Sequence, residues 1–314
     1  MYSINVLVLC YKQEDLIKRA LDSVLCQRDW GLKKIIVQDD CSPDKTWEVI
    51  QEYKNKYPDI IVPYRNEKNL GIYGNFSALE NNRGNADLYC FLAGDDAYCD
   101  GWFKAVQDSL EKRKIELHGV AATICSDIKI IRPNGMSIIN RNARLVEKAK
   151  DVLSMKSRLV IPARSTMTTA ETFNRYEPII TDKGLGIAEE SECARQFLYA
   201  DQFYYIPFVA TVYYTHIGVT TKLTGAKYYN ERKLSFQWMK DNYPLDEKAS
   251  LYKDYQIAQC DFMINPSIHH YLHMVRLYWK AFDRYTLYGA KKVTEILNWW
   301  RMLKLLLKGN NQKE

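Results

Sequence analysis

Two neighbouring carboxylates at the end of an apolar run are the residues of this chain best suited to chemistry. The run Leu88–Leu92 predicts a buried strand, and Gly94, Asp95 and Asp96 follow it closely. Carboxylates are not buried without partners, and at the carboxyl end of a parallel strand they face the crevice where open α/β sheets bind ligands. Two adjacent acids there can hold a hard divalent cation, Mn²⁺ or Mg²⁺, through oxygen ligands.

A second acidic turn supports the same kind of site. Asp39 and Asp40 follow the apolar run Ile35–Val37 and stand just before Ser42. Two strands that deliver acids to the same edge of a sheet predict a metal-dependent site for a nucleotide diphosphate. A histidine cluster with helical spacing could also bind metal, but a packed, aromatic-rich helix is the expected structure there; its members are His269, His270 and His273.

The elements that must position these acids alternate between strand and helix. The predicted strands are Ile4–Leu9, Ile35–Gln38, Ile60–Val62 and Leu88–Leu92, and the predicted helices between them are 17–25, 42–57 and 71–83. This alternation predicts right-handed βαβ units and a parallel sheet. The second helix is expected to begin at Ser42, whose hydroxyl would cap it, with Pro43 at the first helical position.

The pattern is less regular after residue 100. A helix is predicted over 102–110, a strand over 120–125, mixed surface segments over 130–165, a helix over 189–198, and strands over 203–206 and 211–214. From about residue 227 onward the chain looks helical and rich in aromatic residues.

Length and composition limit the protein classes that fit. The chain has 314 residues, of which 47% are hydrophobic, and this suffices for one large α/β domain with an appendage. The formal net charge is +6, and Lys and Arg are scattered rather than gathered into a stripe, which disfavours nucleic-acid binding. Eight cysteines without a C-x-x-C pattern favour a reducing cytoplasm. We expect no signal peptide and no transmembrane helix.

Residues 291–308 predict a basic amphipathic helix with paired tryptophans, Trp299 and Trp300. Such a helix can lie at the inner face of the cell membrane. The alternative is a helix packed on the domain or on a second subunit, so the oligomeric state stays open.

Several motifs together resemble the family-2 glycosyltransferases in order and spacing. They cover about residues 1–220, and the C-terminal helical part lies outside the resemblance. The motifs are Ile4–Tyr11, Gln38–Ser42, Asn69–Phe76, Gly94–Asp96, Ala188–Glu192 and Val212–His216.

The resemblance implies a GT-A fold, in which a Rossmann-like, mixed and mostly parallel sheet is flanked by helices. A transferase domain over 1–220 would comprise a nucleotide-binding half, 1–98, and an acceptor half, 99–220, with a helical region over 221–314. The implied reaction is an inverting, metal-assisted transfer from a nucleotide-sugar donor to a hydroxyl of a glycan or a lipid-linked acceptor.

The resemblance also implies residue roles. Glu190 would be the catalytic base, and Asp96 with His216 would serve the Mn²⁺ or Mg²⁺ ion. The nucleotide-binding positions would be Leu9, Tyr11, Asp39, Asp40, Asn69, Gly71, Asn75 and Asp95, with Asp40 on the nucleobase. The family more often has Asp at the base position, so the choice among Glu189, Glu190 and Glu192 stays open.

Two departures from the family pattern affect the expected phosphate contacts. Leu9–Lys12 replaces the family's usual Pro-Thr/Ser-Tyr-Asn, and the basic residue often found in the phosphate-side helix is replaced near Gly74. The phosphate charge must therefore be met by metal, Arg65, Lys68 or other cations.

Two other functions compete with a transferase. A sugar nucleotidyltransferase needs a glycine-rich loop after the first strand, and Cys10–Glu14 contains no glycine. A non-catalytic module for nucleotide sugars or glycans would keep the metal pair and tolerate loss of the base. A dinucleotide-dependent oxidoreductase is disfavoured because G-x-G-x-x-G is missing. UDP is the expected donor nucleotide with a hexose or N-acetylhexosamine, and thymidine and guanosine stay open as bases.

Overall fold

The computed structural model of the chain describes residues 1–143, 165–176, 195–196, 199–215, 217, 225–242, 245, 247–281, 299–300 and 302–304. They fall into two units, one formed by the described residues up to 217 and one by those from 225 onward. The predicted domain bounds, 1–220 and 221–314, stay a prediction.

Strand and helix alternate along the first 112 residues, as the apolar pattern predicts. The elements are β1 (Ile4–Cys10), α1 (Ile17–Leu25), β2 (Leu32–Asp39), α2 (Thr46–Lys56), β3 (Ile61–Arg65), α3 (Gly71–Asn81), β4 (Leu88–Ala93), β5 (Ala97–Tyr98) and α4 (Trp102–Lys112). Further along come β6 (Ala122–Ile131), β7 (Ser137–Asn140), β8 (Thr166–Thr169), α7 (Ala170–Asn174) and β9 (Gln202–Tyr214).

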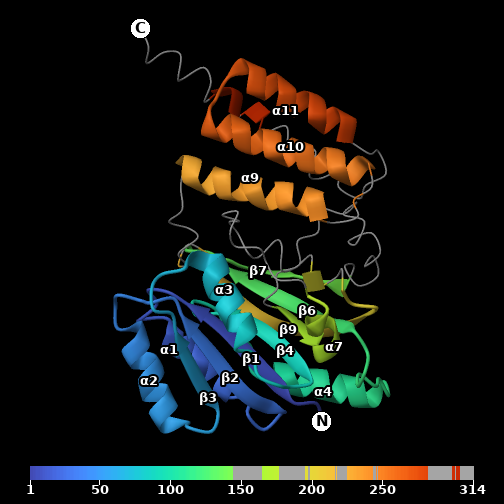
Figure 1. Ribbon diagram of the computed structural model, residues 1–314. Coiled ribbons are helices and arrows are strands. Elements are labelled where there is room, and N and C mark those ends of the chain that lie inside the picture. Colours follow the sequence, from blue (N-terminus) through green and yellow to red (C-terminus); the bar gives the residue numbers. More distant parts are fainter. Residues whose placement is uncertain are drawn as a thin grey trace. The chain divides into compact units, whose positions relative to one another are not determined.

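These strands form one sheet in the order β3-β2-β1-β4-β8-β6-β9-β5, with β7 paired to β6 (Figure 1). The four N-terminal strands β1 to β4 are parallel to one another, so their carboxyl ends lie at one edge. Strand β8 is antiparallel to both β4 and β6, whereas β6 and β9 are parallel. The predicted mixed, mostly parallel GT-A-like sheet with flanking helices is confirmed.

Alternate residues of the central strands face opposite layers, because successive side chains of a strand point to opposite faces. Val6, Val8 and Cys90 belong to the core formed with α1, α2 and α4. On the other face, Phe91 stacks on Phe76 of α3, at 4.8 Å between ring centroids. The ring centroid of Phe173 in α7 lies 5.8 Å from that of Phe91. Burial on both faces explains why these strands are continuous apolar runs.

Three expectations need correction. Helix α2 begins at Thr46 and not at Ser42, because the Ser42 hydroxyl donates to the Asp39 carboxylate instead of capping a helix. The two strands predicted over 203–206 and 211–214 are the single strand β9, which pairs irregularly with β6 near Asp127. The stretch 130–165, predicted as mixed surface segments, contains strand β7.

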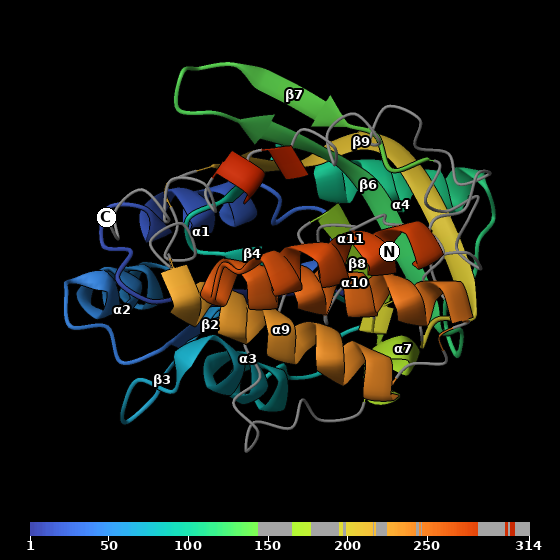
Figure 2. The ribbon, with the colours of Figure 1, turned by 90° about the horizontal axis from the view of Figure 1, so that it is seen from above.

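The second unit contains three helices, α9 (Gly225–Asn242), α10 (Glu247–Ile264) and α11 (Ile268–Ala281). Their axes run side by side in both views (Figure 2). Tyr255 of α10 and Tyr278 of α11 belong to an apolar core that these two helices share with Trp299 and Met302. Ion pairs join Lys233 to Asp261 at 2.6 Å and Lys240 to Asp254 at 2.5 Å, which links α9 to α10. No described helix is long and apolar enough to cross a membrane.

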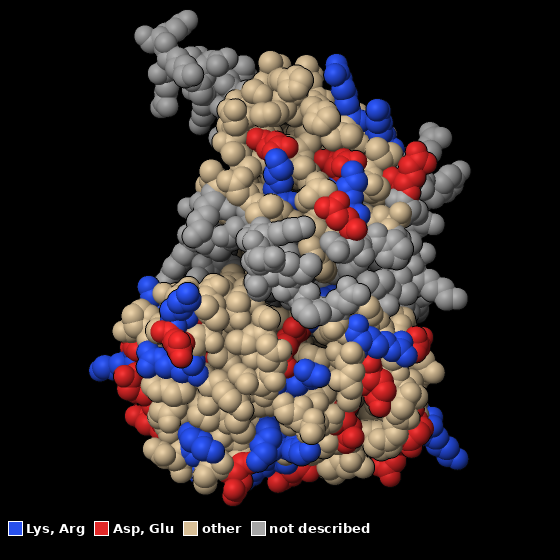
Figure 3. All heavy atoms as spheres, viewed as in Figure 1, with Lys and Arg blue, Asp and Glu red and all other residues tan. Residues whose placement is uncertain are grey.

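Basic and acidic side chains are interspersed over the first unit on the face shown in Figure 3. The scatter of charge expected from the sequence is therefore visible on this face. Among the described cysteines, none forms a disulfide.

A buried ion pair joins Arg195 to helix α3. The Arg195 guanidinium is 1% exposed and pairs with the Glu80 carboxylate, which is 12% exposed. Burial raises the pKa of Glu80, and the charge and hydrogen bond of Arg195 oppose the rise. Gln196 extends the anchor, because its carbonyl accepts from the Thr123 hydroxyl at 2.7 Å and its side chain from Thr166 at 2.7 Å.

Breaking this pair should destabilise the fold strongly. Arg195→Ala leaves the Glu80 carboxylate buried without its cation, so we expect the free energy of unfolding to fall by about 3–5 kcal/mol in urea titrations. The double variant Glu80→Met/Arg195→Met should recover most of the loss. The control is Arg175→Ala, which removes an exposed pair with Asp201 and should cost at most about 1 kcal/mol. Equal losses in Arg195→Ala and Arg175→Ala would contradict the structural role.

Candidate functional site

The carboxyl ends of three parallel strands are joined by backbone hydrogen bonds at one edge of the sheet. The Asp40 amide donates to the Cys10 carbonyl at 3.1 Å, which links the end of β2 to β1. The Gly94 amide donates to the Leu9 carbonyl at 2.9 Å, which links the end of β4 to β1. The two acidic turns predicted from the sequence therefore flank the end of β1. Tyr11, the next predicted nucleotide contact, is half-buried just beyond it.

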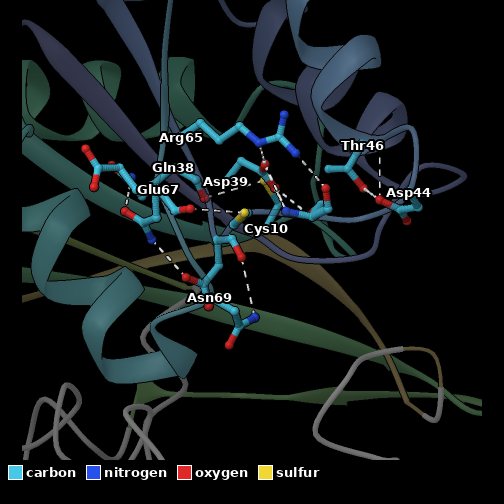
Figure 4. Close-up of polar contacts among 12 residues, drawn as sticks. Cys10, Gln38, Asp39, Asp44, Thr46, Arg65, Glu67 and Asn69 are labelled. Carbon is cyan, nitrogen blue, oxygen red and sulfur yellow. Dashed lines mark hydrogen bonds and ion pairs between the residues drawn. The ribbon is translucent and has the colours of Figure 1, made fainter.

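Asp39 is a fully buried carboxylate that organises its own turn (Figure 4). It accepts from the Ser42 amide at 3.2 Å and from the Ser42 hydroxyl, and Arg65 Nε lies 3.2 Å away. Burial raises the pKa of Asp39, while the Ser42 hydrogen bonds and the Arg65 charge oppose the rise. Burial and the nearby acids raise the pKa of the Cys10 thiol well above its ordinary value, so it is a neutral packing group.

Asp40 holds the loop that precedes α3. Its carboxylate accepts from Asn66 Nδ2 at 2.8 Å, from the Leu70 amide at 2.8 Å and from the Gly71 amide at 2.9 Å. Gly71 adopts a φ of 74°, in the left-handed region that favours glycine. Asn69 reaches back to the Asp40 carbonyl at 3.4 Å. The motif Asn69–Asn75 is therefore tied to the Asp39-Asp40 turn.

A network of side-chain amides completes this half of the site. Asn75 is 4% exposed, and its Nδ2 lies 3.5 Å from the Cys10 carbonyl and 3.4 Å from the Gln38 carbonyl. Asn66 bridges Asn75 and Asp40, and it accepts from Gln38 Nε2 at 2.9 Å. The sequence analysis missed Asn66, because an isolated Asn in a loop gives no pattern.

The Gly94-Asp95-Asp96 turn lies close to the end of β9. Asp95 is half-buried, and Asp96 is 1% exposed. Asp96 Oδ1 accepts from the Tyr214 amide at 3.3 Å. Gly94 is closely packed, because a Cβ there would lie 2.3 Å from Gln13 Oε1 and 2.9 Å from Ile17 Cδ1, so a larger residue would displace these side chains.

Arg19 of α1 is a second residue that the sequence analysis missed. Its Nη2 donates to the Asp95 carbonyl, and its guanidinium carbon lies 3.8 Å from the centre of the Tyr214 ring. It thus braces the acidic turn against β9 by a hydrogen bond and a cation–π contact. Arg65, named above as a candidate for phosphate charge, instead pairs with Asp39 and donates to the Ser42 carbonyl at 2.8 Å.

The donor chemistry of this edge suits a hard cation. Within the described ranges, no group of three or more His, Cys, Asp or Glu side chains is placed to hold a metal ion by itself. Mg²⁺ commonly takes only one or two protein carboxylates and completes its shell with water and substrate phosphates. Asp95 and Asp96 supply oxygen donors of that kind, so the residues present fit such a cation.

The predicted base and the predicted histidine lie outside the described residues. The structure describes none of Glu189, Glu190, Glu192 and His216, so their roles stay predictions. The chain next to His216 is fixed, because the Thr215 amide donates to the Ile131 carbonyl at 3.0 Å.

Known proteins resemble the chain in sequence over part of its length. The family model described as Glycosyl transferase family 2 matches residues 5–156. An uncharacterized protein of Mycobacterium tuberculosis is 28% identical over 132 residues, which are 42% of this chain and 36% of that protein. The processive diacylglycerol beta-glycosyltransferase of Mycoplasma pneumoniae is 29% identical over 116 residues, 36% of this chain and 33% of that enzyme. The chain thus matches about a third of the length of these curated relatives.

Solved structures show the same fold. The crystal structure of S. aureus TarS superposes with a TM-score of 0.58 at 14% identity, covering 90% of this chain and 49% of that one. The structure of TarS residues 1–349 in complex with UDP-GlcNAc gives a TM-score of 0.57 at 15% identity, covering 89% and 80%.

The mostly parallel sheet with two acidic turns at one edge has the GT-A-like fold of these glycosyltransferase structures. Residues 5–156 match the family model of the family 2 glycosyltransferases. The resemblance predicted from the motifs is thereby confirmed over those residues.

Removing the Asp40 carboxylate should loosen the loop before α3. Asp40→Ala deletes the acceptor for two backbone amides and one side-chain amide, so we expect about 1–3 kcal/mol less stability in urea unfolding. The control Glu67→Ala removes an exposed acid from the same loop and should change stability by less than about 0.5 kcal/mol. A loss no larger than that of the control would show that Asp40 does not hold the loop.

Proposed function

We propose that the chain is an inverting glycosyltransferase that moves a sugar from a nucleotide-diphosphate donor to a hydroxyl of a glycan or lipid-linked acceptor. The observation that carries the proposal is the meeting of the Asp39-Asp40 turn, the Asp95-Asp96 turn and the end of β9 at one sheet edge. A UDP-sugar is the proposed donor, and the complex of TarS with UDP-GlcNAc supports it. The sugar transferred is a hexose or an N-acetylhexosamine.

The proposed division of labour follows the two turns. The turn containing Asp39 and Asp40, with Tyr11 and the loop Asn69–Asn75, forms the nucleoside side. The Asp40 carboxylate accepts from two amides of this loop. Asp40 would therefore support nucleobase binding both by positioning the loop and by direct contact. Asp95 would face the ribose and the sugar, and Asp96 with His216 would hold Mn²⁺ or Mg²⁺.

When bound, the cation would stabilise the negative charge of the departing diphosphate as a Lewis acid. The protein's own part is to hold the Asp96 carboxylate in place, which the Tyr214 amide and the brace of Arg19 on the same turn provide. A carboxylate that is already oriented costs little to bring to its working position.

The proposed chemical step is a single displacement. Glu190 takes the proton of the acceptor hydroxyl, the acceptor oxygen bonds to the anomeric carbon, and the bond from that carbon to the diphosphate oxygen breaks. Attack opposite the leaving group inverts the anomeric centre. A carboxylate needs a raised pKa and close reach to the hydroxyl to act as this base.

The acceptor proposal has support from one relative. The Mycoplasma pneumoniae enzyme is named for diacylglycerol, and a lipid-linked acceptor for the present chain is consistent with that likeness. Work on a surface polysaccharide at the inner face of the cell membrane, with contact through 291–308, also belongs to the proposal. Most of 291–308 lies outside the described residues.

Removing the negative charge of Asp96 should weaken metal-dependent donor binding. Asp96→Asn keeps an oxygen that can accept from the Tyr214 amide but removes the negative charge, so we expect at least about tenfold weaker Mn²⁺-dependent stabilisation by UDP-sugars in thermal shift assays. Asp100→Asn, an exposed acid four residues further on, is the matched control and should behave like wild type. Wild-type Mn²⁺ dependence in Asp96→Asn would remove this residue from the metal site.

Glu190→Gln should separate binding from turnover. Loss of the base should lower kcat by about 10²–10⁴-fold while donor binding is kept. Parallel Glu189→Gln and Glu192→Gln variants, assayed for sugar transfer, identify which acid is the base. A wild-type protein that binds donor and never transfers or hydrolyses it would favour the binding-module alternative.

A further inference from the structure

Helix α11 sorts its exposed side chains into two adjoining strips. At 3.6 residues per turn, Ile268, Leu272 and Trp279 share one narrow strip, and they are 59%, 45% and 59% exposed. The opposite side of α11 is turned to the helical core, where Met274 is fully buried and Tyr278 is 5% exposed. The apolar strip is therefore largely exposed, although Trp279 also contacts Trp299 of the core.

The second strip is basic. Arg276 and Lys280 are exposed and lie beside the apolar strip, together with the exposed His269 and His273. The 14 residues of α11 contain no Asp or Glu. An apolar strip with Trp bordered by Lys and Arg is the pattern of helices that lie in the interface of a lipid bilayer.

A second stretch extends the pattern beyond α11. Trp299 packs on Tyr278 and Trp279, with ring centroids 4.7 Å and 6.3 Å apart, and Met302 packs against the same core. Trp300 is 57% exposed, and Lys304 Nζ lies 5.7 Å from the centre of its ring. A further aromatic and a further cation thus adjoin the face.

We propose that this face, defined by Ile268, Leu272, Arg276, Trp279 and Lys280, docks on a membrane surface rich in anionic lipid. Trp and Leu would enter the headgroup region, and Arg and Lys would pair with phosphate groups. Charge favours this occupant over a second copy of the chain, because a two-fold contact through the same face would bring basic strips close together. The inference does not depend on the transfer reaction.

Vesicle co-sedimentation of the full chain tests the proposal without donor or acceptor. Vesicles of phosphatidylcholine alone are compared with vesicles that also contain phosphatidylglycerol, at low and at physiological salt. We expect at least about tenfold stronger binding to the anionic vesicles, reduced by salt. Leu272→Ser/Trp279→Ser should weaken binding about tenfold or more, because it removes the inserted side chains.

Two matched controls locate the effect on α11. Leu234→Ser removes a leucine of α9 that is 40% exposed, close to the exposure of Leu272, and should bind like wild type. Arg276→Glu/Lys280→Glu should abolish the preference for anionic lipid. The control for this variant is Lys56→Glu/Lys112→Glu, which reverses two basic side chains outside α11. Each of the two double variants lowers the formal net charge from +6 to +2. Only Arg276→Glu/Lys280→Glu should lose binding to the anionic vesicles.

Four results would overturn the proposal. The first is wild-type protein that fails to sediment with anionic vesicles, and the second is α11 variants that bind like their controls. A lower melting temperature in Leu272→Ser/Trp279→Ser, with vesicle binding kept, would show that the face packs within the chain. A change from oligomer to monomer in light scattering, with vesicle binding kept, would assign the face to a second copy.

Discussion

Burial of carboxylates at one edge of a parallel sheet is the constraint on which the rest of this structure depends. Asp39, Asp40 and Asp96 are each at most 2% exposed, and a buried charge is tolerated only when it is hydrogen-bonded or paired. The chain meets this demand with backbone amides, amide side chains and one arginine. The loops at the strand ends are consequently fixed by the same acids that a ligand would use.

The two acidic turns meet the demand in different ways. Asp39 and Asp40 are saturated by contacts from Ser42, Arg65 and the loop before α3. That half of the site is therefore a preformed surface, and Arg65 contributes to structure there. The Asp95-Asp96 turn depends on α1 and β9 instead, through Arg19 and the Tyr214 amide. Elements far apart in the sequence thus control the orientation of the proposed metal-binding acid.

The helical unit is stabilised by a different set of contacts. Its core is aromatic, with Tyr255, Tyr278 and Trp299 in mutual contact, and ion pairs join α9 to α10. The exposed face of α11 adds apolar and basic side chains, of which Trp279 also contacts this core. An exposed apolar face of this kind usually serves an interaction, and this is the face that we propose docks on a membrane surface.

The sequence by itself determined the central βαβ architecture, because apolar runs of strand length alternate with helical spacing. The predicted face of α1, Ile17, Ala20, Leu21, Val24 and Leu25, is the buried face. It also determined which acids follow the apolar runs of β2 and β4, since a carboxylate needs polar partners that an apolar core does not supply. Only the tertiary structure decided that β8 enters the sheet antiparallel, that Ser42 binds Asp39 instead of capping a helix, and that Arg19 and Asn66 belong to the site. The side-chain contacts among these outcomes join residues 3, 26 and 76 positions apart in the sequence. A local pattern carries no record of which distant group will satisfy a buried polar atom.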